Sequence, residues 1–138
     1  MTKVPLTKAN RRLAYGRGRR AESIAAWWLR LKGYRILAHS FRVPVGEIDL
    51  VARRGRTIAL VEVKARADLE TAQAAIGARQ RRRIERAAAS FLQRYPALAR
   101  CDIRFDVVLL VPGRWPRHLT DAWRTSGSLH GTGGAPIL

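Results

Sequence analysis

The segment Thr57 to Lys64 constrains the fold most, because it is apolar on both faces when it is written as a β-strand. A strand of this kind is covered on both sides, so it belongs in the middle of a sheet with helices on each face. Gly55 precedes it at a position typical of a hairpin turn, and Glu47 to Arg53 then forms the antiparallel neighbour. We therefore expect a hairpin at the centre of the sheet.

Further periodic segments extend this hairpin into a domain. Alternation and helical spacing distinguish strands from helices among them. The order helix, three strands, helix, strand predicts an α/β domain with a mixed β-sheet flanked by helices. The segments are a helix over 18–32 ended by Gly33, a strand over 34–43, a helical pattern over 69–95 with Gly77 as a candidate interruption, and a buried strand over 103–111.

The two ends of the chain differ in composition from the domain between them. Residues 1–17 are polar and basic with few apolar side chains, and we expect a disordered basic arm there. Residues 125–138 are rich in Gly, Ser and Thr, which predicts a flexible tail. The folded domain is expected over residues 18–124.

The charge of the chain indicates its partner. It carries 27 basic and 10 acidic side chains, for a formal net charge of +17. An excess of this size exceeds what solubility needs and favours a polyanionic partner, nucleic acid, over a merely basic protein. Arginine outnumbers lysine, and its planar fork suits phosphate oxygens.

Cysteine and histidine usage argues against disulfides and zinc sites. The single cysteine, Cys101, cannot form an internal disulfide, and the three histidines are scattered. No apolar stretch approaches the roughly 20 residues that a bilayer span requires. We expect a cytoplasmic protein with no membrane partner.

Two charged residues stand inside the apolar central strand. Glu62 and Lys64 are two positions apart, so they project from the same face as Leu60. If Gly55 and Arg56 form a two-residue loop, Asp49 lies directly opposite Glu62. A carboxylate on a core face is costly unless it is paired or bound to a metal.

Two carboxylates facing each other on rigid strands are what a Mg²⁺ or Mn²⁺ site requires, and Lys64 beside them could orient a water or stabilise negative charge at a phosphate. Two alternatives stay open. A loop one residue longer would put Asp49 and Glu62 on opposite faces of the sheet. Glu62 could also form a structural ion pair with Lys64 while Asp49 is exposed.

These strands carry a family resemblance. Gly46-Glu47-Ile48-Asp49-Leu50-Val51-Ala52 and Val61-Glu62-Val63-Lys64-Ala65-Arg66 resemble the signature of the YraN family, bacterial proteins similar to archaeal Holliday-junction resolvases. Resolvases belong to the PD-(D/E)xK nucleases, which have a restriction-endonuclease-like core. The resemblance implies that Asp49 and Glu62 are metal ligands and that Lys64 is the catalytic lysine. It also implies a homodimer, although no segment identifies an interface.

Three more segments fit the family pattern. Gly18-Arg19-Arg20-Ala21-Glu22 resembles its first helix, where the glutamate completes the metal site in resolvase relatives. Glu22 could equally stabilise the first turn of the helix. Arg79-Gln80-Arg81-Arg82 resembles a Lys-Gln-Arg-Arg element, and Arg104-Phe105-Asp106-Val107-Val108 resembles the last strand motif. The roles of Asp106 and Glu47 stay unassigned.

Helical geometry separates the residues of the second helix into two faces. Gln80 falls on the apolar face, where its amide needs a partner; the candidate site or a structural hydrogen bond could supply one. The opposite face is cationic and is expected to bind phosphates rather than only to be solvated. It consists of Arg79, Arg82, Arg83 and Arg86. Trp27 and Trp28, on the first helix, are expected in the core.

Together these patterns predict a metal-dependent endonuclease that hydrolyses DNA, with Asp49, Glu62, Lys64 and Gln80 as catalytic candidates. Action on branched DNA is implied only by the resemblance to resolvases. The first alternative is a nucleic-acid-binding module of the same fold without catalysis. The second is a basic adaptor for RNA, carried by the arm and the arginine helix.

Overall fold

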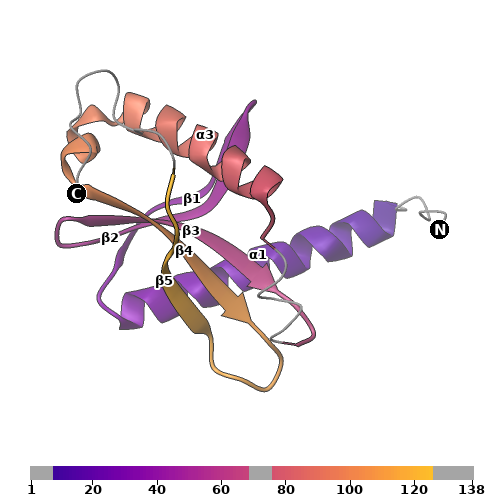
Figure 1. Ribbon diagram of the computed structural model, residues 1–138. Helices are drawn as coiled ribbons and strands as arrows, with labels where there is room; N and C mark the ends of the chain where they lie inside the picture. Colours follow the sequence, from indigo (N-terminus) through magenta and orange to yellow (C-terminus); the bar gives the residue numbers. More distant parts are fainter. Residues whose placement is uncertain (1–7, 69–75, 126–138) are drawn as a thin grey trace.

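A five-stranded mixed sheet forms the centre of the molecule (Figure 1). The computed structural model describes residues 8–68 and 76–125, with side chains described from residue 19 onward. The strands lie side by side in chain order; β3 and β4 are parallel and the other neighbours are antiparallel. They are β1 Arg35–Val43, β2 Gly46–Arg54, β3 Thr57–Ala65, β4 Asp102–Leu110 and β5 Arg117–Trp123. The segment Thr57–Ala65 is the central strand, as the sequence predicts.

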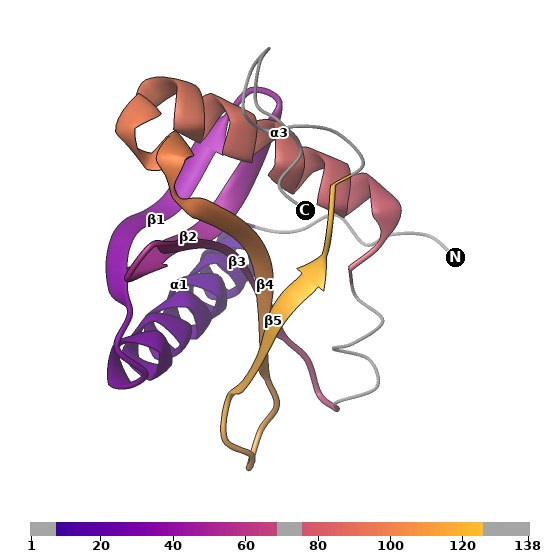
Figure 2. The ribbon, with the colours of Figure 1, turned by 60° about the vertical axis from the view of Figure 1, so that its left-hand side comes forward.

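Helices cover both faces of this sheet (Figures 1 and 2). Helix α1 spans Lys8–Leu31 and packs on one face, and α3, which spans Ala78–Arg94, packs on the other; a 3-10 helix, Pro96–Arg100, follows α3. Ile58 and Leu60 of β3 contact the α3 side, whereas Ala59 and Val61 contact the α1 side. This arrangement confirms the expected α/β class and is consistent with a restriction-endonuclease-like core.

The expected hairpin register is also confirmed. Arg54 pairs with Thr57 and Leu50 pairs with Val61, so Gly55 and Arg56 form a two-residue loop. Gly55 has a φ of 61°, in the left-handed region that such loops use and that glycine adopts without strain. The ladder ends at Leu50 and Val61, so Asp49 and Glu62 are the next residues along the two strands.

The first helix begins ten residues earlier than the sequence suggested. Residues 8–17, expected in a disordered arm, belong to α1. Lys, Arg, Ala and Leu, which are frequent in this segment, have high helix propensity, and this propensity favours a helix even where few residues are apolar. Trp27, expected in the core, is half-exposed. Most of the expected tail and the start of the expected second helix lie outside the described residues. The ranges concerned are 1–7, 69–75 and 126–138.

Strand β5 is absent from the sequence-based expectation. Its residues are mostly exposed and show no apolar alternation, because it is an edge strand that packs mainly through Trp123. Only pairing with β4 makes it a strand. Within the described residues, no helix is long and apolar enough to cross a membrane.

Gly46 allows α3 to approach the sheet closely. A Cβ atom at this position would lie 1.9 Å from the backbone carbonyl oxygen of Arg83 and 2.7 Å from its carbonyl carbon. Backbone atoms in mid-helix cannot move aside individually, so any larger residue would displace α3. The position of α3 relative to β2 therefore depends on glycine here.

The substitution Gly46→Ala should lower the free energy of unfolding by about 2 kcal/mol or more, because the added methyl group overlaps the helix backbone. Urea denaturation followed by circular dichroism measures the change. Gly77→Ser is the matched control: nothing lies within 4 Å of a Cβ at Gly77, and serine is a good helix N-cap, so stability should stay equal or rise. Equal stability of Gly46→Ala and the native protein would contradict the close approach.

Candidate functional site

Glu62, Lys64 and Gln80 form a hydrogen-bonded cluster between β3 and α3. Glu62 and Lys64 are only 4% and 9% exposed. Lys64 Nζ lies 3.0 Å from Glu62 Oε1 and donates to Gln80 Oε1 at 3.0 Å. Gln80 Nε2 donates to Glu62 Oε1 at 2.7 Å. The amide of Gln80 therefore finds its partners at the candidate site, which is where the helical geometry directs it.

Asp49 brings a second carboxyl group to this cluster from β2. Its Oδ2 atom accepts a hydrogen bond of 2.8 Å from the backbone N–H of Val63. Burial raises the pKa of Asp49 to about 8, and the neighbouring Glu62 and Glu22 charges add to the effect. Unlike Glu62, which pairs with Lys64, the Asp49 carboxyl group has no cationic partner among the described contacts.

The backbone around Asp49 departs from a regular ladder. Ile48 packs in the same cluster as Val51, whereas Leu50 packs on the opposite face, so the side chains of β2 do not alternate regularly between Ile48 and Val51. In β1, Ser40 has a φ of 49°, and it lies between the pairs His39–Leu50 and Phe41–Ile48. Left-handed backbone at a residue other than glycine is strained and concentrates at functional positions.

Burial and the neighbouring Lys64 act on the pKa of Glu62 in opposite directions. Burial raises the pKa of Glu62 above its ordinary value, and the Lys64 ammonium opposes that rise. Asp49 and Glu62 thus form two adjacent acids, of which Glu62 pairs with Lys64. A divalent cation could bring positive charge to both carboxylates.

Glu22 lies near this pair but makes a different contact. Its carboxylate accepts a 2.7 Å hydrogen bond from Ser40 Oγ, and its charge contributes to the raised pKa of Asp49. Residues 8–68 and 76–125 contain no group of three or more His, Cys, Asp and Glu side chains placed to hold a metal ion. The structure therefore brings Asp49 and Glu62 together, and Glu22 as a third metal ligand stays a prediction.

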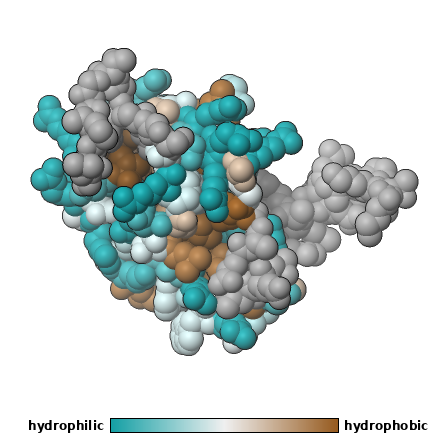
Figure 3. Space-filling model, in the orientation of Figure 1, coloured by the Kyte–Doolittle hydropathy of each residue, from teal (hydrophilic) through white to brown (hydrophobic). Residues whose placement is uncertain are grey.

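A hollow of about 440 Å³ opens beside Gln80. It is lined by Glu47, Gly77, Arg79, Gln80, Arg83 and Ile84. The four arginines expected on the outer face of α3, Arg79, Arg82, Arg83 and Arg86, are all exposed. Figure 3 shows hydrophilic residues gathered over α3 in the upper part of the view. A cationic surface therefore borders the buried acids.

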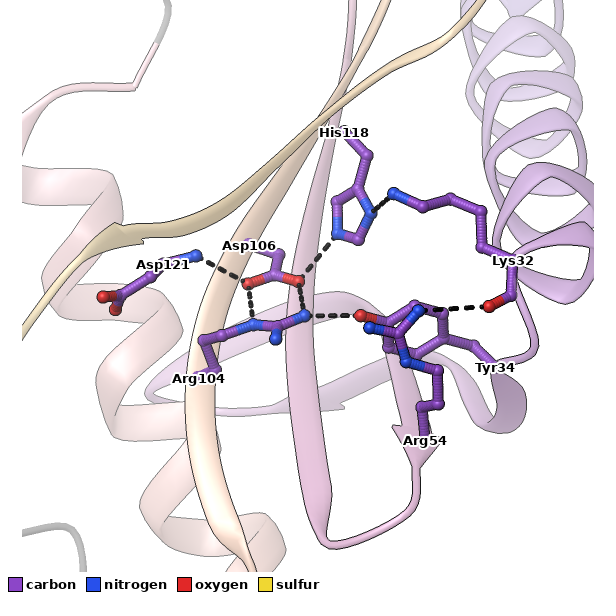
Figure 4. A network of polar contacts seen from close by, with 7 residues as sticks. All are labelled: Lys32, Tyr34, Arg54, Arg104, Asp106, His118 and Asp121. Carbon is purple, nitrogen blue, oxygen red and sulfur yellow. Dashed lines mark hydrogen bonds and ion pairs between the residues drawn. The ribbon is translucent and has the colours of Figure 1, made fainter.

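Asp106, which the sequence left unassigned, belongs to a separate network on the α1 side of the sheet (Figure 4). Arg104 donates to both of its carboxylate oxygens, at 2.8 and 2.7 Å. His118 Nε2 lies 2.7 Å from Oδ2, and the backbone N–H of Asp121 donates to Oδ1 at 3.0 Å. Asp106 is fully buried, yet donors meet both of its oxygens.

The same network extends to the end of α1. Lys32 Nζ lies 2.6 Å from His118 Nδ1, so Nδ1 accepts and Nε2 carries the proton that is donated to Asp106. Arg104 also donates to Tyr34 Oη at 2.6 Å. Burial alone would raise the pKa of Asp106, but hydrogen bonds from His118 and Arg104 hold it below its ordinary value. This acid is a structural anion, and sequence reasoning missed His118 because a single histidine carries no motif.

Comparison with protein families places the chain. The model of "Uncharacterised protein family UPF0102" matches residues 21–110, about two thirds of the sequence. The chain belongs to this family. UPF0102 is the family of the YraN proteins, so the resemblance seen in the two central strands is confirmed at that level.

Several UPF0102 proteins are close in sequence. The UPF0102 protein of Parvibaculum lavamentivorans is 61% identical over 111 residues, which cover 80% of this chain and 84% of the relative. UPF0102 protein amb4503 of Paramagnetospirillum magneticum is 53% identical over 128 residues, covering 90% and 98%. A UPF0102 protein of Methylorubrum extorquens is 54% identical over 119 residues, covering 86% and 93%. These names state no activity.

The part of the chain that matches UPF0102 contains the whole candidate site. Glu22, Asp49, Glu62, Lys64 and Gln80 all lie within residues 21–110. Strand β5 and its histidine lie beyond that match. The acids, the lysine and the amide are therefore features of the UPF0102 region itself.

Replacing Asp49 by asparagine should stabilise the protein at pH 8. Asparagine can still accept from Val63 N–H and can donate to Glu62, and it removes an acid whose pKa of about 8 shows that ionisation is disfavoured in the folded state. Since a raised carboxyl pKa costs stability above the pKa of the unfolded chain, the free energy of unfolding should rise by about 1 kcal/mol or more. Urea titrations at pH 5 and pH 8 measure this, with the larger gain at pH 8. The exposed Asp102→Asn is the control, and a loss of stability on Asp49→Asn would contradict the assignment.

Asp106→Asn should have the opposite effect. It leaves the Arg104 guanidinium without its charged partner, and we expect a loss of about 3 kcal/mol at pH 7. Because the pKa of Asp106 is lowered by folding, its contribution is present above about pH 4 and is lost as the pH falls further. The difference between variant and native protein should therefore shrink toward pH 3 in urea titrations. The exposed Asp121→Asn, which removes only a surface ion pair, should change stability by less than about 0.5 kcal/mol.

Proposed function

We propose that this chain is a metal-dependent nuclease that hydrolyses phosphodiester bonds of DNA at the site formed by Asp49, Glu62 and Lys64. The observation that carries the proposal is the pair formed in the middle of the sheet by the buried Glu62 and the partly buried Asp49, with the Lys64 ammonium 3.0 Å from Glu62. Such a pair destabilises the fold, so its presence favours a function that needs it.

The donor set fits a hard divalent cation. Asp49 and Glu62 would hold Mg²⁺ or Mn²⁺ through carboxylate oxygens, which are the ligands these ions prefer. The bound ion would supply Lewis-acid polarisation of a phosphate oxygen and a water of lowered pKa. The backbone N–H of Val63 orients the Asp49 carboxyl group by donating a hydrogen bond to Oδ2.

Lys64 has its ammonium group fixed beside the acids. Glu62 and Gln80 each contact Nζ at 3.0 Å, so the ammonium group is already fixed in position before a substrate binds. From there Nζ could stabilise the negative charge that develops on a phosphate and hold or release a proton at an attacking water. Gln80 acts as a positioning residue for both Lys64 and Glu62.

The cationic surface of α3 supports a nucleic-acid substrate. Arg79 and Arg83 line the hollow next to Gln80, and Arg82 and Arg86 continue the exposed face of the helix. Guanidinium groups bind phosphate oxygens in pairs and give binding that depends on the backbone rather than the base sequence. We further propose that the substrate is DNA, in particular branched DNA, and that the enzyme is a homodimer. Both parts follow from the family's resemblance to resolvases.

A module that binds nucleic acid without cleaving it is the second candidate. It is favoured by one observation: Glu62, Lys64 and Gln80 satisfy one another without a metal ion. Under this alternative the α3 arginines bind phosphate and the acid pair is only a costly part of the core.

A cleavage assay on branched, flapped and linear DNA with Mg²⁺ or Mn²⁺ distinguishes the nuclease from the binding module. Glu62→Gln and Lys64→Met should each lower the cleavage rate by roughly 100-fold or more, because the first removes a metal ligand and the second removes the ammonium group beside the reacting phosphate. Isothermal titration with Mn²⁺ alone should show binding to the native protein that Glu62→Gln abolishes. DNA affinity without metal should change little in either variant.

The carboxylate control is Asp102→Asn, which lies exposed at the start of β4 and should keep native cleavage and Mn²⁺ binding. Equal cleavage by the native protein, Glu62→Gln and Lys64→Met would mean that the activity comes from a contaminant. That result, or native protein that neither binds Mn²⁺ nor cuts, would leave the binding module as the function.

A further inference from the structure

Three tryptophans, of which two are exposed and one is partly buried, form a ridge on the α1 side of the molecule. Trp27 and Trp28 lie on α1, and Trp115 lies in the connection between β4 and β5. The Trp28 and Trp115 rings stack with centroids 5.8 Å apart and an interplanar angle of 30°, and Trp27 lies 6.4 Å from Trp28. The views in Figures 1 and 2 both show the β4–β5 connection on the side of the sheet where α1 lies. We call this set, Trp27, Trp28 and Trp115, the tryptophan ridge.

The ridge is unusual in how much of it meets water. Trp115 is 76% exposed and Trp27 is 50% exposed, and Leu31 of the same helix is 62% exposed. Tryptophan is the largest hydrophobic side chain, and contiguous exposed apolar groups on a soluble protein mark an interaction surface. The fold does not need these rings outside, because the α1 side of the core is filled by other residues.

Charge around the ridge identifies the kind of partner. The two segments that form it, residues 23–35 and 107–120, contain no acidic residue. They carry exposed cations close in sequence to the rings: Arg30 and Lys32 near Trp27 and Trp28, and Arg114 and Arg117 around Trp115. Exposed aromatic rings set among cations fit a polyanion whose units have flat apolar faces.

We propose that the tryptophan ridge binds unpaired nucleotides of single-stranded nucleic acid, whose bases stack on Trp115 and Trp27. The Trp28–Trp115 stack is the start of a column that a base can continue on the exposed ring, and Arg30 and Arg114 contact the phosphates on either side. Paired bases in a duplex hide their faces from such a ridge, so single strands are preferred over blunt duplex.

This surface is distinct from the proposed nuclease site. The acid pair and Lys64 lie with the α3 side of the core, whereas the ridge belongs to α1, on the other face of the sheet. Binding at the ridge therefore needs neither metal nor the acids. A lipid surface also binds tryptophans and cations, but the stacking of Trp28 on Trp115 and the arginine content favour bases and phosphates.

Fluorescence anisotropy in EDTA tests the proposal with a labelled oligothymidylate of about 16 nucleotides and an abasic oligomer of the same length and charge. Trp115→Ala should weaken oligothymidylate binding by roughly fivefold or more and leave abasic binding unchanged. Trp115→Phe should keep most of the affinity because it keeps a stacking ring. Arg30→Ala with Arg114→Ala should weaken both oligomers and flatten the salt dependence.

Tyr95→Ala is the matched control, because this aromatic residue is 45% exposed but lies outside the ridge, and it should bind both oligomers as the native protein does. Equal effects of Trp115→Ala on the two oligomers, or none on either, would overturn base stacking. Sedimentation with phosphatidylcholine–phosphatidylglycerol vesicles tests whether the ridge binds a lipid surface instead. The proposal would also be overturned if Trp115→Ala removed vesicle binding and left the affinity for oligothymidylate intact. Glu62→Gln should retain ridge binding even if it is found to cleave nothing.

Discussion

Two carboxyl groups, Asp49 and Glu62, meet between strands that are buried on both faces, and the rest of the molecule is arranged so that this contact persists. Two acids in such a place repel each other and lose hydration, which raises the pKa of both. In a flexible loop the two acids would move apart. Strands β2 and β3 hold them in place, because the hairpin is closed by a two-residue loop and is packed between two hydrophobic layers. The sheet thus holds an unfavourable contact in place, as a preorganised metal or catalytic site requires.

Helix α3 connects this buried site to the surface. Its apolar residues, such as Ile84 and Phe91, pack on the sheet, and Gly46 lets the helix backbone approach β2. Gln80 is thereby brought within hydrogen-bonding distance of Glu62 and Lys64. The opposite side of the same helix exposes arginines. One helix therefore both orders the charged cluster and presents the cations that would bring a phosphate backbone to it.

Two aspartates of the sheet have opposite pKa shifts because their surroundings differ. Asp106 and Asp49 both lie in the sheet, but folding lowers the pKa of Asp106 and raises that of Asp49. Asp106 receives hydrogen bonds from Arg104, His118 and a backbone amide, which compensate its charge. Asp49 receives one backbone N–H and faces another carboxyl group. The first acid stabilises the α1 side of the fold, and the second costs stability at the site for which we propose catalysis.

The sequence by itself determined the α/β class, the central hairpin and the position of Glu62 and Lys64 on one strand face, because local periodicity fixes which side chains share a face. It also placed Gln80 on the apolar face of its helix, since helical geometry is regular. The hairpin register and the approach of Asp49 to Glu62 were left open by the sequence and are given by the paired strands. Tertiary structure decided the rest. Edge strand β5 exists only through pairing with β4, the network around Asp106 joins residues from distant segments, and the exposure of Trp27 depends on which face of α1 the sheet covers. Such features depend on contacts between segments far apart in the chain, which no local pattern encodes.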